Sequence, residues 1–404
     1  MKNKKLSNLS MFMVMLGFTF FSASMWAGQQ LAAGLNFRDF LLALLFGGLI
    51  LAAYTGTLGY IGGESSLSLD ELARRSFGEK GSFLPSAMIS FTQIGWFGVG
   101  LAMFAIPVAK ELMHLDVTPD QMPWQGYLLV AIAGVLMTAS AYFDIKGLTV
   151  VSYVAVPLVA ILGTVAMILA VRGGSVGLVE QFSQGSKTLG VLAGAGLVVG
   201  SFVSGGTATP NFTRYAKNAK VACIMTVIAF FLGNSLMFFF GAVSSIYAGG
   251  NDIFEVMLNL NMFYFAVLVL GLNIWTTNDN ALFTAGLGLS NIFGLRKKTM
   301  VLISGLIGTV AAVWLYWNFC GWLNVLNCTL PPVGIILIIS YFANRKAYLD
   351  GSLPKRTVDW WAIAGVVLGA VVANLVKWGF PAINGMAVAA ICYCTGLCLA
   401  KRKA

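Results

Sequence analysis

The segment from Gly271 to Asn280, which reads GLNIWTTNDN, places polar side chains inside an apolar run long enough to cross a membrane. Asn273, Thr276 and Thr277 are spaced i, i+3, i+4, so they share one face of a helix. Several oxygen atoms on one face, at the depth of a bilayer, suit a small dehydrated cation. The alternative is that these side chains bond only to their own backbone or to a neighbouring helix.

Asp279 is an acidic residue inside the same apolar run. Ionisable residues at this depth are candidates for function. On a helical wheel Asp279 lies about 120° from the centre of the stripe that Asn273 begins and Asn280 ends. We therefore expect Asp279 to hold another helix rather than to bind the cation, while a role as a proton carrier stays open.

The composition indicates a membrane protein. Of 404 residues, 58 % are hydrophobic and 10 % are charged, which is more apolar surface than a soluble domain can bury. Twelve apolar stretches are long enough to span a bilayer, once the uncharged run 299–344 is divided near 317–321. We therefore predict an all-α protein with twelve transmembrane helices. They are expected at 9–34, 39–62, 82–109, 124–144, 148–171, 188–209, 221–248, 262–287, 298–317, 320–343, 358–376 and 380–400.

The net charge of +10 indicates topology rather than nucleic-acid binding. With both termini placed in the cytoplasm, twenty of the 25 Lys and Arg residues fall on the inner side. This bias follows the positive-inside rule and requires an even number of spans. The five on the outer side are Arg38, Lys110, Arg172, Lys187 and Lys377.

Residues suited to enzyme chemistry are scarce. The single histidine, His114, falls in a predicted outer loop, and no phosphate loop, nucleophile elbow or zinc spacing occurs. Cys392, Cys394 and Cys398 lie in the last span without a partner histidine, and 392 and 394 point to different faces. We predict that the chain is not an enzyme and has no cofactor.

Small, flexible residues interrupt two spans at corresponding places. The first span carries 17–24, and the sixth carries 200–207 followed by Pro210. Phe21 and Phe202 are 181 residues apart, and Trp96 of the third span and Trp275 of the eighth are 179 apart, so nearly one offset relates the two halves. Because five is an odd number, a repeated five-helix unit must be inverted in the membrane. Broken helices at equivalent positions of the two halves indicate the binding site of a transporter. The alternative is that glycine and serine serve close helix packing. We predict repeats at 1–175 and 176–345, and two additional helices in 346–404.

Aromatic residues beside these interruptions indicate the ligand. Gln93 and Trp96 are spaced i, i+3, so both can face one cavity, and Phe21 and Phe202 flank the two interruptions. Aromatic faces with an amide fit a flat, neutral heterocycle that has an edge to hydrogen-bond. Core packing is the alternative role for the aromatic residues.

Four segments carry a family resemblance that runs from Met11 to the tenth span. They are FTFFSASMW (18–26), QIGWFGVGLAMFAIPV (93–108), VVGSFVSGGT (198–207) and GLNIWTTNDNAL (271–282). The chain resembles the cytosine-permease branch of the nucleobase–cation symport family. The resemblance implies a LeuT-like inverted five-helix repeat with two C-terminal helices, sodium coupling, alternating access and a place in the bacterial cytoplasmic (inner) membrane.

The resemblance also implies site residues. Where the hydantoin member of the family has a glutamine after its first-helix cation ligand, this chain has Phe21, which favours the permease branch over a hydantoin substrate. Sodium would lie between spans one and eight, and cytosine between two aromatic rings. The implied sodium ligands are the backbone oxygens of Gly17, Phe20 and Asn273 and the hydroxyls of Thr276 and Thr277. The implied cytosine residues are Phe21, Gln93, Trp96, Phe202, Ser204 and Gly205.

These observations predict a secondary active transporter that imports cytosine with sodium. We expect a monomer surrounded by membrane lipid, with no nucleic-acid partner. One alternative is a proton-coupled permease for another nucleobase or related heterocycle, with Asp279 as the proton carrier. A channel or a nutrient-sensing receptor is a further alternative. A channel requires a continuous polar lining and a receptor requires a soluble output domain, and the sequence offers neither.

Overall fold

The structure is a computed structural model that describes residues 5–142, 145–184, 187–250, 253–353, 356–376 and 378–403. Throughout these ranges the regular elements are helices. The long helices are α1 (Asn8–Thr19), α2 (Ser22–Gly34), α3 (Phe37–Ser65), α5 (Phe83–Glu111), α6 (Trp124–Ala141), α7 (Ile145–Gly173), α9 (Val191–Ala208), α12 (Asn234–Ala248), α14 (Phe263–Phe293), α15 (Lys297–Trp317), α16 (Phe319–Thr329), α17 (Pro331–Ala343), α19 (Trp360–Leu375) and α20 (Pro381–Lys403). The shorter ones are α4 (Leu69–Phe77), α8 (Leu178–Ser183), α10 (Pro210–Thr213), α11 (Ala219–Val227), the π-helical turn η1 (Ile228–Gly233), α13 (Ile253–Asn259) and α18 (Arg345–Asp350).

Each of the twelve predicted spans coincides with helix. Among the described residues, nine helical segments are long and apolar enough to cross a membrane, and the bent pair α1–α2 makes a tenth. The eighth predicted span is α14, which has 31 residues but carries the polar segment, and the eleventh is α19, which has only 16 residues. The all-α, multi-pass prediction is therefore confirmed. The predicted division near 317–321 is also confirmed, because α15 ends at Trp317 and α16 begins at Phe319.

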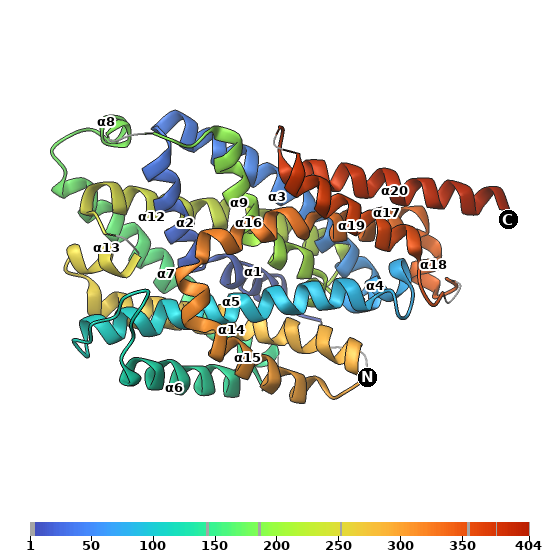
Figure 1. Ribbon diagram of the computed structural model, residues 1–404, viewed down its shortest axis with the longest axis horizontal. Helices are drawn as coiled ribbons and strands as arrows, with labels where there is room; N and C mark the ends of the chain where they lie inside the picture. The colour runs from blue at the N-terminus through green and yellow to red at the C-terminus, as the bar shows by residue number, and fades with distance from the viewer. Residues whose placement is uncertain are drawn as a thin grey trace.

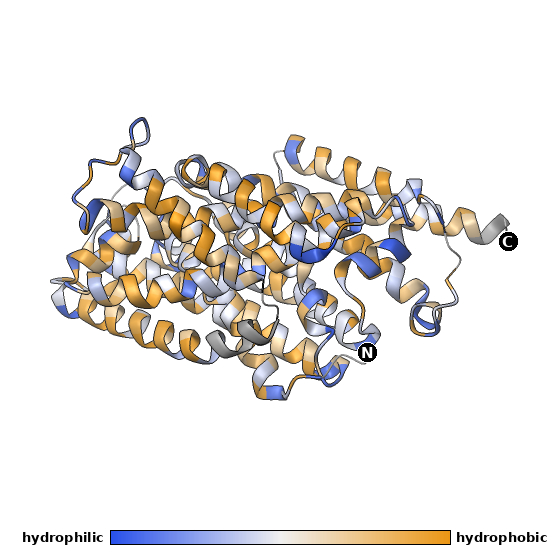
Figure 2. Cartoon of the chain, turned by 90° about the horizontal axis from the view of Figure 1, so that it is seen from below, coloured by the Kyte–Doolittle hydropathy of each residue, from blue (hydrophilic) through white to orange (hydrophobic). Residues whose placement is uncertain are grey.

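Several of the long helices, among them α5, α6 and α20, run roughly along the long axis of the molecule (Figure 1). Helix α14 packs against α5, α15, α7 and α6, while α3 packs on α9, α2 on α12 and α1 on α7. Hydrophilic residues gather mainly in the loops and short helices at the two ends (Figure 2). Both ends of the chain lie at the end that holds α4 and α18, and α8 and α13 lie at the other (Figure 1). This arrangement fits an even number of crossings.

The predicted interruption of the first span is present. Helix α1 ends at Thr19, α2 begins at Ser22, and their axes differ by 49°. Between them Phe20 (φ −76°, ψ 86°) and Phe21 (φ −130°, ψ 132°) leave the helical region of backbone space. The break exposes the last carbonyls of α1 and the first amides of α2, because helix ends lack intrahelical partners.

The predicted interruption of the sixth span at 200–207 was wrong. Helix α9 continues through these residues to Ala208, and the chain turns only at Thr209, ahead of Pro210. The small residues instead allow close packing. A Cβ on Gly200 would lie 2.8 Å from the carbonyl oxygen of Leu323, and one on Gly206 would lie 2.4 Å from a Thr55 methyl group. The repeat boundaries at 175/176 and 345/346 stay predictions.

Candidate functional site

All six residues predicted to bind the base line one buried cavity at the centre of the helices. They come from the α1–α2 break, α5 and α9, which the fold brings together. Thr277 of the predicted cation site lines the same cavity, so the two predicted sites adjoin. The lining residues are Phe18, Phe21, Gln93, Trp96, Ser201, Phe202, Ser204, Gly205, Thr277 and Ala281.

Trp96 links three sides of this cavity. Its indole Nε1 donates a hydrogen bond to Ser204 Oγ at 2.8 Å, which joins α5 to α9. Its ring meets the Phe21 ring edge-on, with centroids 5.8 Å apart and an interplanar angle of 70°. Phe202, which also lines the cavity, is held edge-on by Phe18 at 5.8 Å and by Phe230 at 5.7 Å. The two aromatic walls are therefore fixed by contacts with separate neighbours.

Gln93 provides an unpaired donor in the cavity. The side chain is 2 % exposed, and its Nε2 has no hydrogen-bond partner among the described residues. Leaving a buried amide donor unpaired costs about 1–3 kcal/mol, so such a group signals a missing partner. The space inside the cavity is about 10 Å³, close to the minimum for one water molecule. A heterocycle therefore enters only when the surrounding helices move apart.

Hydrogen bonds connect four of the five predicted cation residues beside the α1–α2 break, while Gly17 lies near the end of α1, where a Cβ would meet Ser152 of α7. The hydroxyls of Thr276 and Thr277 donate to the carbonyl oxygen of Asn273 at 2.7 and 3.1 Å. The Asn273 side chain closes the break, because its Nδ2 donates to Phe20 O and its Oδ1 accepts from Ser22 N–H at 3.0 Å. The family resemblance implied only the backbone oxygen of Asn273 as a ligand, and the two hydrogen bonds of its side-chain amide were not predicted.

This cluster suits a hard monovalent cation. The Thr276 and Thr277 hydroxyls keep oxygen lone pairs after donating to Asn273. The carbonyl of Gly17, in the last turn of α1, has no partner within its helix, and that of Phe20, which follows the helix, keeps a lone pair beyond its bond from Asn273 Nδ2. The C-terminal end of α1 also carries the negative end of its helix dipole. Coordination by Asn273 O would require both hydroxyl protons to turn away from it.

Asp279 lies away from this cluster, as its helical direction predicts. It is 5 % exposed and accepts a hydrogen bond from Ser140 Oγ on α6 at 2.6 Å. Ser140 Oγ in turn accepts from the indole Nε1 of Trp275 at 2.6 Å. Asp279 therefore ties α14 to α6.

An aromatic layer closes the cavity towards the end that holds α8 and α13. Phe319 at the start of α16 stacks on Trp26 with centroids 4.4 Å apart and planes within 5°, and it meets Trp96 edge-on at 6.2 Å. Trp26 also stacks on Tyr316 at 5.2 Å. Beyond this layer lies a wider cavity of about 570 Å³, lined by Trp26, Phe319 and Lys110 among others. No local pattern in the sequence indicates this layer.

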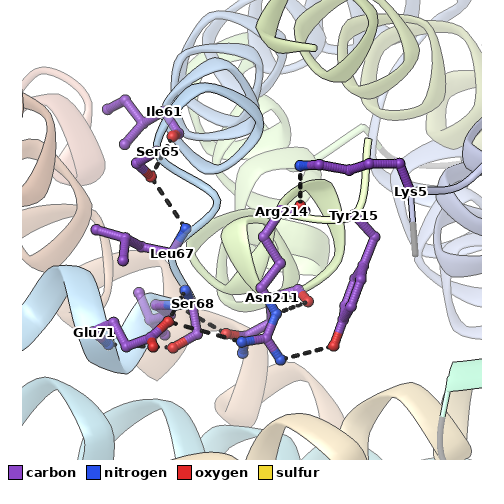
Figure 3. A network of polar contacts seen from close by, with 10 residues as sticks. Lys5, Ile61, Ser65, Leu67, Ser68, Glu71, Asn211, Arg214 and Tyr215 are labelled. Carbon is purple, nitrogen blue, oxygen red and sulfur yellow. Dashed lines mark hydrogen bonds and ion pairs between the residues drawn. The ribbon is translucent and has the colours of Figure 1, made fainter. Parts of the chain in front are cut away.

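A polar network closes the opposite end, where the N-terminal segment lies (Figure 3). Lys5 Nζ donates to Arg214 O and to Ser66 Oγ, both at 2.9 Å. The Arg214 guanidinium lies 3.8 Å from the Glu71 carboxylate, and Asn211 Oδ1 accepts from the backbone N–H of Leu69 at 2.9 Å (Figure 3). These contacts join the N-terminal segment, α4 and the end of the sixth span.

Asp70 on α4 forms a second polar cluster at this end. It accepts a hydrogen bond from Ser86 Oγ at 2.5 Å, and Ser86 also accepts from Asn291 Nδ2 at 2.8 Å. Arg74 Nε donates to Asn291 Oδ1 at 2.6 Å. Burial raises the pKa of the Asp70 carboxyl, while the Ser86 hydrogen bond and the guanidinium groups of Arg74 and Arg214 act in the opposite direction. The cluster joins α4, α5 and α14.

The broken first span, the enclosed central cavity and closures on both sides define a membrane transporter. Residues 2–376 match the family described as permeases for cytosine/purines, uracil, thiamine and allantoin, and the chain belongs to this family. The family resemblance seen in the sequence is thereby confirmed. Because its relatives are permeases, the chain is a multi-pass transporter and not an enzyme.

Curated relatives agree with this assignment. Cytosine permease of Escherichia coli (strain K12) is 47 % identical over 387 residues, which cover 95 % of this chain and 90 % of that protein. Hydantoin permease of Microbacterium maritypicum is 26 % identical over 344 residues, covering 75 % of this chain and 68 % of that protein.

Solved structures confirm the predicted LeuT-like, inverted-repeat fold. A nucleobase-cation-symport-1 family transporter in a closed conformation with bromovinylhydantoin bound superposes with a TM-score of 0.83 at 19 % identity, over 99 % of this chain and 94 % of that one. A Na⁺-coupled sialic acid symporter in a substrate-bound outward-open state gives a TM-score of 0.71 at 12 % identity, over 98 % and 90 % of the two chains.

Proposed function

We propose that this protein imports cytosine together with sodium by alternating access. The observation that carries the proposal is the shared position of Thr277, which lines the aromatic cavity and belongs to the oxygen cluster beside the broken helix. Substrate and ion would then bind side by side, so each could favour the other. The identity to cytosine permease supports cytosine as the base.

The cavity offers complementary chemistry for this base. The rings of Trp96 and Phe202 would stack on its two faces, since base–aromatic stacking is favourable for a planar heterocycle. Gln93 Nε2 is an unpaired donor that could meet a ring acceptor of cytosine. Ser204 and Gly205 on α9 would lie at the edge of the base, beside the bond from Trp96 to Ser204.

Sodium would bind through oxygen atoms of α1 and α14. Carbonyls of Gly17, Phe20 and Asn273 with the hydroxyls of Thr276 and Thr277 supply five oxygens, and such neutral ligands suit a hard cation. Because these ligands come from both sides of the α1–α14 contact, binding of the ion would stabilise that contact.

Alternating access would open the two closures in turn. Towards the end that holds α8 and α13, the Phe319–Trp26 stack would part to admit the base from the wider cavity. At the opposite end, the Glu71–Arg214 and Lys5–Arg214 contacts would part to release it. The small central space supports this cycle, because the base has no room while both ends are closed.

A proton-coupled permease for another nucleobase is the second candidate, because Asp279 is a buried carboxyl inside a span. Its contact with Ser140, on the side away from the cavity, argues against direct coupling to the base.

Uptake of labelled cytosine into proteoliposomes separates the two candidates. We expect an inward sodium gradient to drive accumulation at equal pH, and a proton gradient without sodium to leave uptake at the background level. Uptake driven by the proton gradient alone would instead establish the second candidate.

The charge distribution supports a bacterial cytoplasmic membrane protein with both termini in the cytoplasm. We expect the segment Arg296–Lys298, at the start of α15, to be cytoplasmic. In a cysteine-free background, Lys297→Cys should react with an impermeant maleimide only after the cells are opened. Labelling in intact cells would invert the proposed orientation, and a cysteine replacing Lys110 provides the matched outer position.

A further inference from the structure

The polar stripe of α14 continues beyond the proposed sodium ligands. Asn280 and Thr284 follow Asn273 by about two and three helical turns and point within about 20° of its direction. Both are 1 % exposed, and Asn280 Oδ1 and Thr284 Oγ1 have no hydrogen-bond partner among the described residues. Buried oxygens without partners are unfavourable, so two on one helix face call for a reason.

The stripe leads to the polar cluster at the end that holds the N-terminus. Asn291 lies in the same direction as Asn273, about 27 Å further along the helix axis. Its amide donates to Ser82 and Ser86, and Ser86 donates to Asp70. The stripe therefore connects the proposed sodium ligands to a buried carboxyl at this end of the protein.

We propose that Asn280 Oδ1 and Thr284 Oγ1 form a transient site for sodium on its way out of the protein. This inference rests on the proposed sodium coupling. Along the axis, Asn280 lies about 4.5 Å beyond Thr277, and Thr284 about 6 Å beyond Asn280. An ion that passes through a protein needs sites that bind it strongly enough for it to enter and weakly enough for it to leave. Two weak sites at this spacing would let sodium move on in short steps, so that it never loses all its oxygen ligands at once.

The residues around Asn280 and Thr284 favour passage of sodium over its retention. Two neutral oxygens bind sodium less firmly than the five of the main cluster, and water would complete the coordination. Asp279 on this helix points away, to Ser140, so it does not hold the ion in the stripe. At the far end Arg74 donates to Asn291 Oδ1, and its positive charge opposes a resting cation there. Separation of Arg74 from Asn291 would open the route to water.

Thr284→Val and Asn280→Leu test the proposal, because each keeps the approximate side-chain volume and removes the oxygen. We expect sodium-dependent cytosine binding at equilibrium to stay within about two-fold of wild type, because the main ligands are intact. Sodium-driven net uptake should fall about ten-fold, a barrier change of about 1.4 kcal/mol. Exchange of labelled for unlabelled cytosine, with saturating sodium on both sides, should remain, because exchange does not require sodium to leave.

Two further variants sharpen the test. Thr284→Ser keeps the hydroxyl and should retain net uptake. Thr55→Val on α3 is the matched control, since Thr55 is also buried and its Oγ1 also lacks a partner among the described residues.

Wild-type net uptake by both Thr284→Val and Asn280→Leu would overturn the transient site, as would an equal loss of uptake and exchange. If wild-type uptake ignores the sodium gradient, the proposed sodium coupling itself fails, and that result is visible without any variant.

Discussion

Replacing Trp96 or Phe202 with alanine is expected to weaken cytosine binding by about ten- to hundred-fold. Each ring forms one face of the cavity, and base–aromatic stacking contributes about 1–3 kcal/mol per base. Trp96→Phe should retain most of the affinity, because it keeps an aromatic face and loses only the bond to Ser204. Equilibrium binding of labelled cytosine to purified protein, at saturating sodium, measures the effect.

Controls must separate a loss of base stacking from a loss of protein stability. Truncating a buried aromatic residue costs about 3–5 kcal/mol of folding free energy. Trp124 on α6 is 70 % exposed and Phe91 on α5 is 65 % exposed, so Trp124→Ala and Phe91→Ala are matched substitutions that should leave cytosine affinity unchanged. Thermal unfolding identifies variants that fold. Normal cytosine affinity in folded Trp96→Ala and Phe202→Ala proteins would place the binding site elsewhere.

Both closures lie within reach of the same aromatic cavity. Phe319 of the aromatic layer contacts Trp96, and Phe18 contacts both Phe202 and Phe212 of α10, the residue next to Asn211 of the polar network. Phe18 belongs to α1, the helix that would also carry sodium ligands. A base between Trp96 and Phe202 would therefore press on α16 and on α1 at once. Through these contacts we expect substrate binding to bias which end of the protein opens.

Local patterns in the sequence predicted much of this arrangement. The spacing of Asn273, Thr276 and Thr277 fixed their common face, and that of Gln93 and Trp96 placed both in one cavity. Helical periodicity is a local property, so a single sequence can carry it. The direction of Asp279 was predicted for the same reason.

The parts of the structure that the sequence did not predict depend on contacts between segments far apart in the chain. The residues at 200–207 suit either a broken helix or a tightly packed one, and Thr55 and the backbone of Leu323 settle the choice by packing against Gly206 and Gly200. The bond from Asn273 to Phe20 joins residues 253 positions apart. The Phe319–Trp26 stack likewise has no local signal. The break before Pro331, between α16 and α17, did have one, since proline disfavours helix at the residue before it.

Thr276→Ala and Thr277→Ala are expected to abolish the sodium dependence of cytosine binding at ordinary sodium concentrations. Each removes one of five proposed oxygen ligands, and contacts to a charged group contribute about 1.5–3 kcal/mol, or roughly ten- to hundred-fold in sodium affinity. Because the linkage between two ligands is reciprocal, cytosine affinity measured in sodium should fall towards its value in choline. Binding isotherms in sodium and in choline, at constant ionic strength, measure both effects.

Three further variants test whether the loss of sodium dependence results from the loss of an ion ligand. Thr226→Ala is the matched control, because Thr226 is fully buried on α11 and its hydroxyl donates to Ala222 O, as that of Thr277 does to Asn273 O. It should keep full sodium dependence. Thr277→Ser restores the oxygen and should recover it. Asp279→Asn should keep sodium-dependent binding, because the carboxyl faces Ser140 rather than the cluster. Loss of sodium dependence in Asp279→Asn, with retention in Thr276→Ala and Thr277→Ala, would move the coupling ion away from the α1–α14 contact and make Asp279 its carrier.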